Sequence, residues 1–312
     1  MKHALQFALI LAILVFSGAP RVALAQALKP FKDDLYSLKS RKVLEARDGG
    51  AYKRYVFGDQ DVNGRDKVAG KVAKDNRVDL GVLKSQRVVN IQRDGGAQIE
   101  AYEVGEPKNA SFAVVFVHGA GGNKDIGAND VSFGGNFNRL KNIVSTNGGV
   151  YYSPTVGANA DVNTLITHIR TQSPNARVIL VCGSAGAFAC WDSAKNPKTS
   201  QALAGLVFLG GTDTLPGIEN STIAASRLPI IFSHGSKDPI VPPTDYIDHY
   251  TSLKKMDPKY PVQMQVFEGG KHGTPIRMID YKESLEWLFA EHAKRPITPA
   301  SVGTTKKVEV KK

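Results

Sequence analysis

Residues 177–189 have the sequence RVILVCGSAGAFA, which predicts a strand, a sharp turn and a helix in direct succession. The apolar run Val178–Val181 is typical of a strand buried on both faces, and an alanine-rich helical segment follows it. Ser184 lies at the apex of the turn. Such a turn needs small residues two places before and after the serine, here Cys182 and Gly186, because its backbone approaches the neighbouring strand and helix.

This turn would lift the Ser184 hydroxyl clear of the sheet and aim the first N–H groups of the helix at the same point, where an oxyanion could form. Taken alone, the pattern also fits a serine that only caps a helix after a strand. The remaining strands therefore decide between the two interpretations.

A second buried strand is predicted at Phe112–Val117, and it ends in a glycine-rich loop that begins at His118. Glycines there let backbone N–H groups approach a ligand closely, so this loop could supply a second donor to an oxyanion. We expect His118 to support the loop through a hydrogen bond rather than to act as a base. Residues 124–136 are expected to form a long polar loop that lines an open rim above the strands.

The segments that follow alternate between predicted strands and helices. Further strands are expected at residues 149–154, 203–209, 228–233 and 262–267, and helices at 137–146, 161–171, 244–255 and 276–293. This alternation predicts an α/β fold with a mostly parallel sheet, whose ligands bind beyond the carboxyl ends of the strands. Residues 86–92 and 98–104 predict a hairpin of edge strands.

Two more candidate residues follow predicted strands. Asp238 lies in the loop after the strand at 228–233 and could orient a histidine, although an aspartate before a proline is also a common turn residue. His272 lies in a glycine-flanked loop after the last strand, and the glycines would let the loop carry its ring to the nucleophile. Asp213, after the strand at 203–209, is the alternative acid. Residues 212–227 are too few for a helical lid domain, so we expect an open site.

The chain order Ser184, Asp238, His272 is that of the catalytic triad of the α/β-hydrolase fold. From about residue 98 to residue 293 the chain resembles that family, and particularly its dienelactone hydrolases and carboxylesterases, which have no lid domain. The residues that carry the resemblance are His118-Gly119, Cys182-Gly183-Ser184-Ala185-Gly186, His234-Gly235, Asp238, Val241-Pro242 and His272-Gly273. The chain departs from the family at Cys182, where glycine is common.

The resemblance implies that Ser184 attacks a carbonyl carbon, that His272 takes its proton, and that Asp238 holds the imidazole in the required tautomer. The backbone N–H groups of Ala120 and Ala185 would bind the oxyanion. The expected function is an exported serine hydrolase that cleaves a carboxylic ester through an acyl-enzyme intermediate. An amide or peptide hydrolase and a non-catalytic envelope-associated binding protein are the alternatives. We expect neither a metal nor an organic cofactor.

Residues 1–25 predict a signal peptide. Lys2 precedes the apolar run Ala4–Phe16, which is shorter than the about 20 residues that span a bilayer, and Ala23-Leu24-Ala25 suits a signal peptidase. An uncleaved anchor is the alternative. We expect a periplasmic or secreted protein. Its parts are an N-terminal extension packed on the core (26–90), a hydrolase domain (91–295) and a basic solvated tail (296–312).

The chain carries 40 Lys and Arg against 29 Asp and Glu, a formal net charge of +11, and these residues are spread along the sequence. That distribution favours solubility over nucleic-acid binding. We expect a small-molecule or accessible ester as substrate, no nucleic-acid partner and no stable membrane insertion after signal cleavage; the sequence leaves the oligomeric state open. For Cys182 and Cys190 we expect two buried thiols, with a local disulfide as the alternative.

Overall fold

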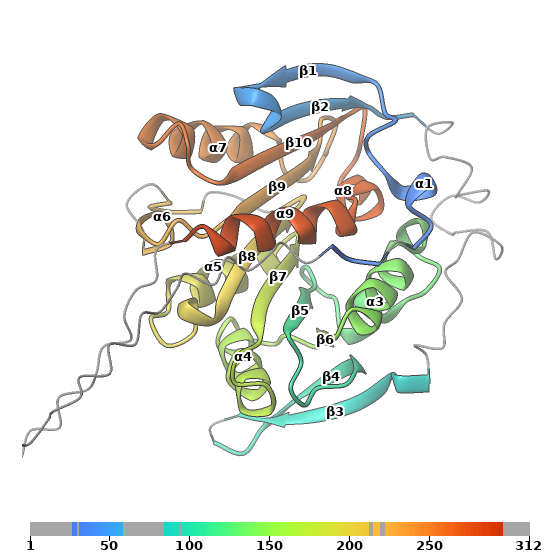
Figure 1. The fold of residues 1–312 in the computed structure, drawn as a ribbon, viewed down its shortest axis with the longest axis vertical. Coiled ribbons are helices and arrows are strands. Elements are labelled where there is room, and N and C mark those ends of the chain that lie inside the picture. The colour runs from blue at the N-terminus through green and yellow to red at the C-terminus, as the bar shows by residue number, and fades with distance from the viewer. Residues whose placement is uncertain are drawn as a thin grey trace, which may run out of the picture.

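The computed structural model describes residues 27–29, 31–58, 84–93, 95–211, 215–218 and 222–295. Within them one ten-stranded sheet twists through the molecule from β1 to β3, in the order β1-β2-β10-β9-β8-β7-β5-β6-β4-β3 (Figure 1). The strands are β1 (Val43–Arg47), β2 (Tyr52–Val56), β3 (Arg87–Gln92), β4 (Gln98–Gly105), β5 (Phe112–Val117), β6 (Gly149–Pro154), β7 (Arg177–Gly183), β8 (Leu203–Leu209), β9 (Ile230–Gly235) and β10 (Val262–Glu268).

The helices connect these strands. They are α1 (Asp33–Tyr36), α2 (Lys124–Ala128), α3 (Asn136–Thr146), α4 (Ala160–Gln172), α5 (Gly186–Lys195), α6 (Thr222–Ala225), α7 (Thr244–Met256), α8 (Thr274–Met278) and α9 (Tyr281–Ala293). Short 3₁₀ turns lie at Asp48–Gly50, Phe133–Gly135 and Ser200–Ala202.

Seven neighbouring strands, from β2 to β6 in the sheet order, pair in parallel. β1 pairs antiparallel with β2, and β4 and β3 extend the opposite side antiparallel. The prediction of a mostly parallel sheet flanked by helices is therefore confirmed. The expected hairpin is present as β3 and β4, of which β3 forms the edge of the sheet.

Each face of the sheet packs on its own helix layer. Buried residues of α4, α5 and α7 join one apolar core, and those of α3, α8 and α9 join the other. β5, β7 and β8 contribute side chains to both cores in alternation, which explains why they appear in the sequence as continuous apolar runs. The carboxyl ends of these strands lie at one edge of the sheet.

The structure corrects several predicted boundaries. The last helix is two helices, because the Asp280 side chain accepts the N–H groups of Lys282 and Glu283 and starts α9 there. The predicted loop at 124–136 contains α2, which Asn123 caps by accepting the Asp125 N–H group. β9 begins after Pro229, two residues later than predicted, and it continues to Gly235.

The expectation of two thiols is wrong, and its alternative holds: Cys182 and Cys190 form a disulfide. Cys182 is near the end of β7, on the face that α5 covers, and Cys190 is in the second turn of α5. Their Cα atoms are 6.4 Å apart, within the usual range for a disulfide. The disulfide thus joins the two arms of the turn that contains Ser184.

The signal-peptide and tail predictions, at 1–25 and 296–312, concern residues outside the described part of the chain. No helix within the described ranges is long and apolar enough to cross a bilayer. In the predicted N-terminal extension, the alternating stretch Tyr52–Val56 forms β2, which pairs in parallel with β10.

Candidate active site

The chain turns sharply between Gly183 at the end of β7 and Gly186 at the start of α5. Ser184 has a φ of 49°, in the left-handed region, which costs an L residue roughly 1–2 kcal/mol. Its N–H group donates to the Leu209 carbonyl oxygen at 3.1 Å, and its carbonyl oxygen accepts the Ala187 N–H group at 3.0 Å. These bonds stabilise a turn that projects the serine from the strand end.

The loop after β5 packs directly against this turn. A Cβ atom at Gly186 would lie 2.6 Å from the carbonyl oxygens of Val117 and His118, so only glycine fits. A Cβ atom at Gly119 would lie 2.8 Å from Cβ of Ser184. The small residue that the sequence pattern requires at Gly186 is therefore explained by close backbone contact with β5 and its loop.

Asp238 and His272 are hydrogen-bonded to one another. The Asp238 side chain is fully buried, and its Oδ2 atom accepts the Nδ1–H group of His272 at 2.7 Å. Its Oδ1 atom accepts the N–H groups of Ile240 and Val241 at 2.9 and 3.1 Å. Both carboxylate oxygens are therefore held in place, whereas the His272 side chain remains 23% exposed and open to solvent.

The end of β8 links the serine turn to the acid–histidine pair. Leu209 accepts the N–H group of Ser184. A Cβ atom on the next residue, Gly210, would lie 2.8 Å from the His272 carbonyl oxygen and 3.7 Å from Oδ2 of Asp238. Ser184, Asp238 and His272 are therefore gathered around one strand end, although they are far apart in the sequence. The alternative acid, Asp213, lies outside the described residues.

A second histidine lies behind the carboxylate. The His234 side chain is fully buried, with Nδ1 3.9 Å from Oδ2 of Asp238 and 3.1 Å from the Gly235 carbonyl oxygen. Burial lowers the pKa of His234, which favours the neutral ring. Because a neutral His234 forms no ion pair with Asp238, the carboxylate interacts mainly with His272.

A pocket lies beside the serine turn. The pocket has a volume of about 350 Å³, and Ala120 and Ala185 both line it. Neither of their N–H groups donates to another described residue, and Ala185 is the N-cap residue of α5, where the helix dipole favours negative charge. The arrangement is suited to binding an oxyanion.

His118 supports this loop, as expected. Its Nε2 atom accepts the Val156 N–H group at 3.0 Å, which places the proton on Nδ1, and Nδ1 lies 2.7 Å from the Gly119 carbonyl oxygen. Both ring nitrogens are thus engaged in fixing the loop after β5 against the loop after β6. Neither is available as a general base.

Comparison with known proteins identifies the fold. Residues 156–288 match a family model described as phospholipase/carboxylesterase, a range that includes Ser184, Asp238 and His272. Among solved structures, a thermostable esterase is similar over 67% of this chain and 63% of its own, at 18% sequence identity and a TM-score of 0.53. The chain has the α/β-hydrolase fold.

The chain is also similar in fold to a puromycin-hydrolysing peptidase of Mycobacterium tuberculosis. The identity is 15% and the TM-score 0.50, over 71% of this chain and 41% of the peptidase. The region of similarity spans less than two thirds of the esterase and less than two thirds of the peptidase. No curated protein matches the sequence.

Sequence reasoning missed the loop after β6, which forms the far wall of the 350 Å³ pocket through Val156–Asn159. Asp161 holds this loop by accepting the N–H groups of Gly157 and Ala158, and it forms a two-bond ion pair with Arg93. Burial raises the pKa of Asp161, but these hydrogen bonds outweigh burial and the net pKa is lowered. Because Arg93 comes from the β3–β4 hairpin, no local signal could have revealed the contact.

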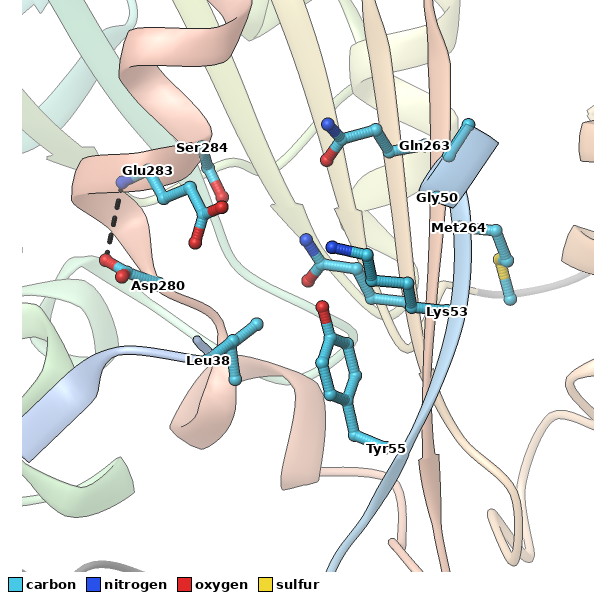
Figure 2. A pocket seen from close by; sticks show the side chains of 11 residues that line it. Leu38, Gly50, Lys53, Tyr55, Gln263, Met264, Asp280, Glu283 and Ser284 are labelled. Carbon is cyan, nitrogen blue, oxygen red and sulfur yellow. Dashed lines mark hydrogen bonds between the residues drawn. The ribbon is translucent and has the colours of Figure 1, made fainter. Parts of the chain in front are cut away.

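A smaller polar pocket of about 30 Å³ lies away from the site, between β2, β10 and α9. In Figure 2, Lys53 and Tyr55 from β2 and Glu283 from α9 surround it. It has room for about two water molecules, and none of the predicted site residues lines it. Within the described ranges, no group of three or more His, Cys, Asp or Glu residues could hold a metal ion.

Proposed function

We propose that this α/β-hydrolase is a serine hydrolase that cleaves carboxylic esters through an acyl-enzyme intermediate. Ser184 is the nucleophile, His272 the general base and Asp238 the acid that orients it. The observation that carries the proposal is the 2.7 Å hydrogen bond from His272 to a fully buried Asp238, at the strand end that also contacts the left-handed turn of Ser184.

The mechanism follows from the protonation states. Because Nδ1 of His272 donates to Asp238, Nε2 carries the free lone pair and takes the hydroxyl proton as Ser184 attacks the carbonyl carbon. The buried carboxylate then stabilises the imidazolium ion. Nε2 returns the proton to the leaving alcohol, and a water molecule resolves the acyl-enzyme with His272 acting as base again.

Charge that develops on the carbonyl oxygen is stabilised by the N–H groups of Ala120 and Ala185. A donor of this kind typically contributes about 3 kcal/mol to the transition state. Gly119 and Gly186 lie in close contact with the serine turn and with β5, so the two donors are held before substrate arrives. Donors that are already in place stabilise the oxyanion better than water molecules, which must reorient during the reaction.

Ester hydrolysis is the preferred activity because the matched family model is described as phospholipase/carboxylesterase. Amide hydrolysis is the second candidate, because a puromycin-hydrolysing peptidase shares the fold. Among the described residues, no charged side chain lines the 350 Å³ pocket, which favours an uncharged group next to the reacting carbonyl. Comparing esters and amides of one acyl group would rank the two activities.

We also propose that the protein is exported after removal of residues 1–25. The basic start, the short apolar run and Ala23-Leu24-Ala25 support this. The Cys182–Cys190 disulfide adds support, because disulfides persist in oxidising compartments such as the periplasm. Cell fractionation with antibody detection would test it: all of the protein in the cytoplasmic fraction, at full precursor mass, would exclude export.

Ester turnover tests the proposed function. Wild type, Ser184→Ala and Ser236→Ala are compared on p-nitrophenyl acetate at equal folded concentration. Ser236 is the matched control, since it follows a strand at the same edge of the sheet, and its Oγ atom accepts the Gly269 N–H group and donates to the Glu268 carboxylate. We expect turnover to disappear in Ser184→Ala and to persist in Ser236→Ala. Folded wild type without turnover on short esters or amides would refute the proposal.

A further inference from the structure

The disulfide closes a short loop that contains part of the proposed active site. Cys182 lies two residues before Ser184 and Cys190 six residues after it, so the closed loop contains the proposed nucleophile and the N–H group of Ala185. Both cysteines are fully buried. The disulfide is therefore a covalent tie between the end of β7 and α5, at the point where the chain changes direction.

The turn inside this loop holds a strained backbone. A serine in the left-handed region relaxes to an ordinary conformation unless its surroundings hold it there. On one side, Gly186 abuts the backbone of β5 and the N–H group of Ser184 bonds to Leu209. These contacts restrain the turn itself, and the disulfide adds a restraint between β7 and the second turn of α5.

On its exposed side α5 is tied to the loop after β6, where Asp192 accepts a hydrogen bond from Asn159 at 2.6 Å, but its buried face makes few polar contacts. Its N-terminal residue, Ala185, supplies no side-chain cap. On its buried face, Nε1 of Trp191 and Oγ of Ser193 have no hydrogen-bond partner within the described chain. The buried face of α5 therefore packs on the sheet through apolar contacts, and the disulfide is a directional link between that face and β7.

We infer that the Cys182–Cys190 disulfide is a positioning element of the active site, which holds Ser184 and the Ala185 N–H group in their reactive geometry. The inference rests on the proposed function, because it concerns the same nucleophile. The rate of hydrolysis then depends on the thiol–disulfide state. Since cytoplasmic thiols are kept reduced, the enzyme would have low activity before export and full activity in an oxidising compartment.

The test separates positioning from simple stabilisation. Wild type is compared with the double variant Cys182→Ala/Cys190→Ala and with Leu253→Ala, a buried residue of α7 that lies outside the turn and serves as a control for lost stability. All three are assayed well below their unfolding temperatures. The readouts are kcat and KM on p-nitrophenyl acetate, the rate of fluorophosphonate labelling, and the pH dependence of kcat.

We expect the double variant to lose at least tenfold in kcat and in labelling rate, with KM within twofold of wild type. The acidic limb of the pH profile should not move, because the hydrogen bond between Asp238 and His272 is not changed. Leu253→Ala should lose stability and keep the kcat of wild type. A folded double variant with the kcat and labelling rate of wild type would overturn the inference.

Reduction of wild type provides a second route if the double variant does not fold. Dithiothreitol transfers two electrons and two protons to the disulfide, which gives two thiols and the cyclic disulfide of the reagent. Reduced wild type that remains folded by circular dichroism should show the same loss of labelling, and unchanged labelling would overturn the inference. Oxidised, folded wild type that is not labelled at all would instead refute the proposed function, and with it the inference.

Discussion

Replacing Gly119 by alanine should disable the site through one added methyl group. A Cβ atom at this position would lie 2.8 Å from Cβ of Ser184 and 3.2 Å from its Oγ atom. Carbon atoms in contact normally lie about 3.5–4.0 Å apart, so the nucleophile or the loop must move by about 0.7 Å. Because a displacement of about 1 Å can cost about 10²-fold in rate, we expect kcat to fall roughly 30- to 100-fold.

Gly157→Ala is the matched control. Gly157 lines the same pocket, but a Cβ atom there would come no closer than 3.6 Å to any neighbour. Steady-state kinetics on a short p-nitrophenyl ester and thermal unfolding should be measured for both variants. We expect Gly157→Ala to remain within about twofold of wild type, and Gly119→Ala to lose about 1–3 kcal/mol of stability as well as rate. A Gly119→Ala variant with the kcat of wild type would refute the account of the serine turn.

Three further predictions follow from the geometry. Asp238→Asn should lower kcat by about 10³- to 10⁴-fold at unchanged fold, because an amide does not enforce the tautomer of His272; stopped-flow or steady-state kinetics would show it. Removing the Cys182–Cys190 disulfide should lower the free energy of unfolding by about 2.5 kcal/mol and Tm by about 5–10 °C. A Tm equal to that of wild type in calorimetry would contradict this. Burial, with Arg295 and Arg177 nearby, lowers the pKa of His292 to about 4. Between about pH 6.5 and 4 the unfolded state therefore binds a proton at His292 that the folded state does not, so the free energy of unfolding falls with pH in this range. In urea titrations, His292→Gln should show a smaller fall over the same range.

The central strands could be predicted because burial on both faces produces an unambiguous pattern. β5, β7 and β8 each appear as an uninterrupted apolar run ended by a glycine or by a glycine-rich loop. The candidate site could be predicted for a related reason: parallel strands bring their carboxyl ends to one edge, so three distant loops were expected to meet there. Asp238 is preferred over Asp213 for another reason, its place beside the His234-Gly235 motif of the resembled family.

The remaining features depend on contacts that no local pattern encodes. The apolar spacing runs on from Ile276 to Phe289, but Asp280 interrupts it, because its side chain caps α9 and pairs at 2.8 Å with the fully buried Arg139. These two residues are 141 positions apart. The ion pair between Arg93 and Asp161 is equally non-local, which is why the loop after β6 could not be foreseen as a wall of the pocket.

The disulfide shows the same limit at short range. Cys182 and Cys190 are separated by eight residues, and that spacing alone fits either two thiols or a cross-link. The cross-link forms because α5 turns back over the face of β7 that carries Cys182. The direction of a helix after a sharp turn is set by packing against the sheet, which the sequence of the turn does not specify.

The most direct test of the central claim is to locate a covalent fluorophosphonate adduct. Oxidised wild type is treated with the probe, digested and mapped by tandem mass spectrometry, with Ser184→Ala and Ser236→Ala treated in parallel. The account predicts one phosphonylated serine, Ser184, with the adduct absent from Ser184→Ala and retained in Ser236→Ala. An adduct on another serine, or none on folded wild type, would contradict it.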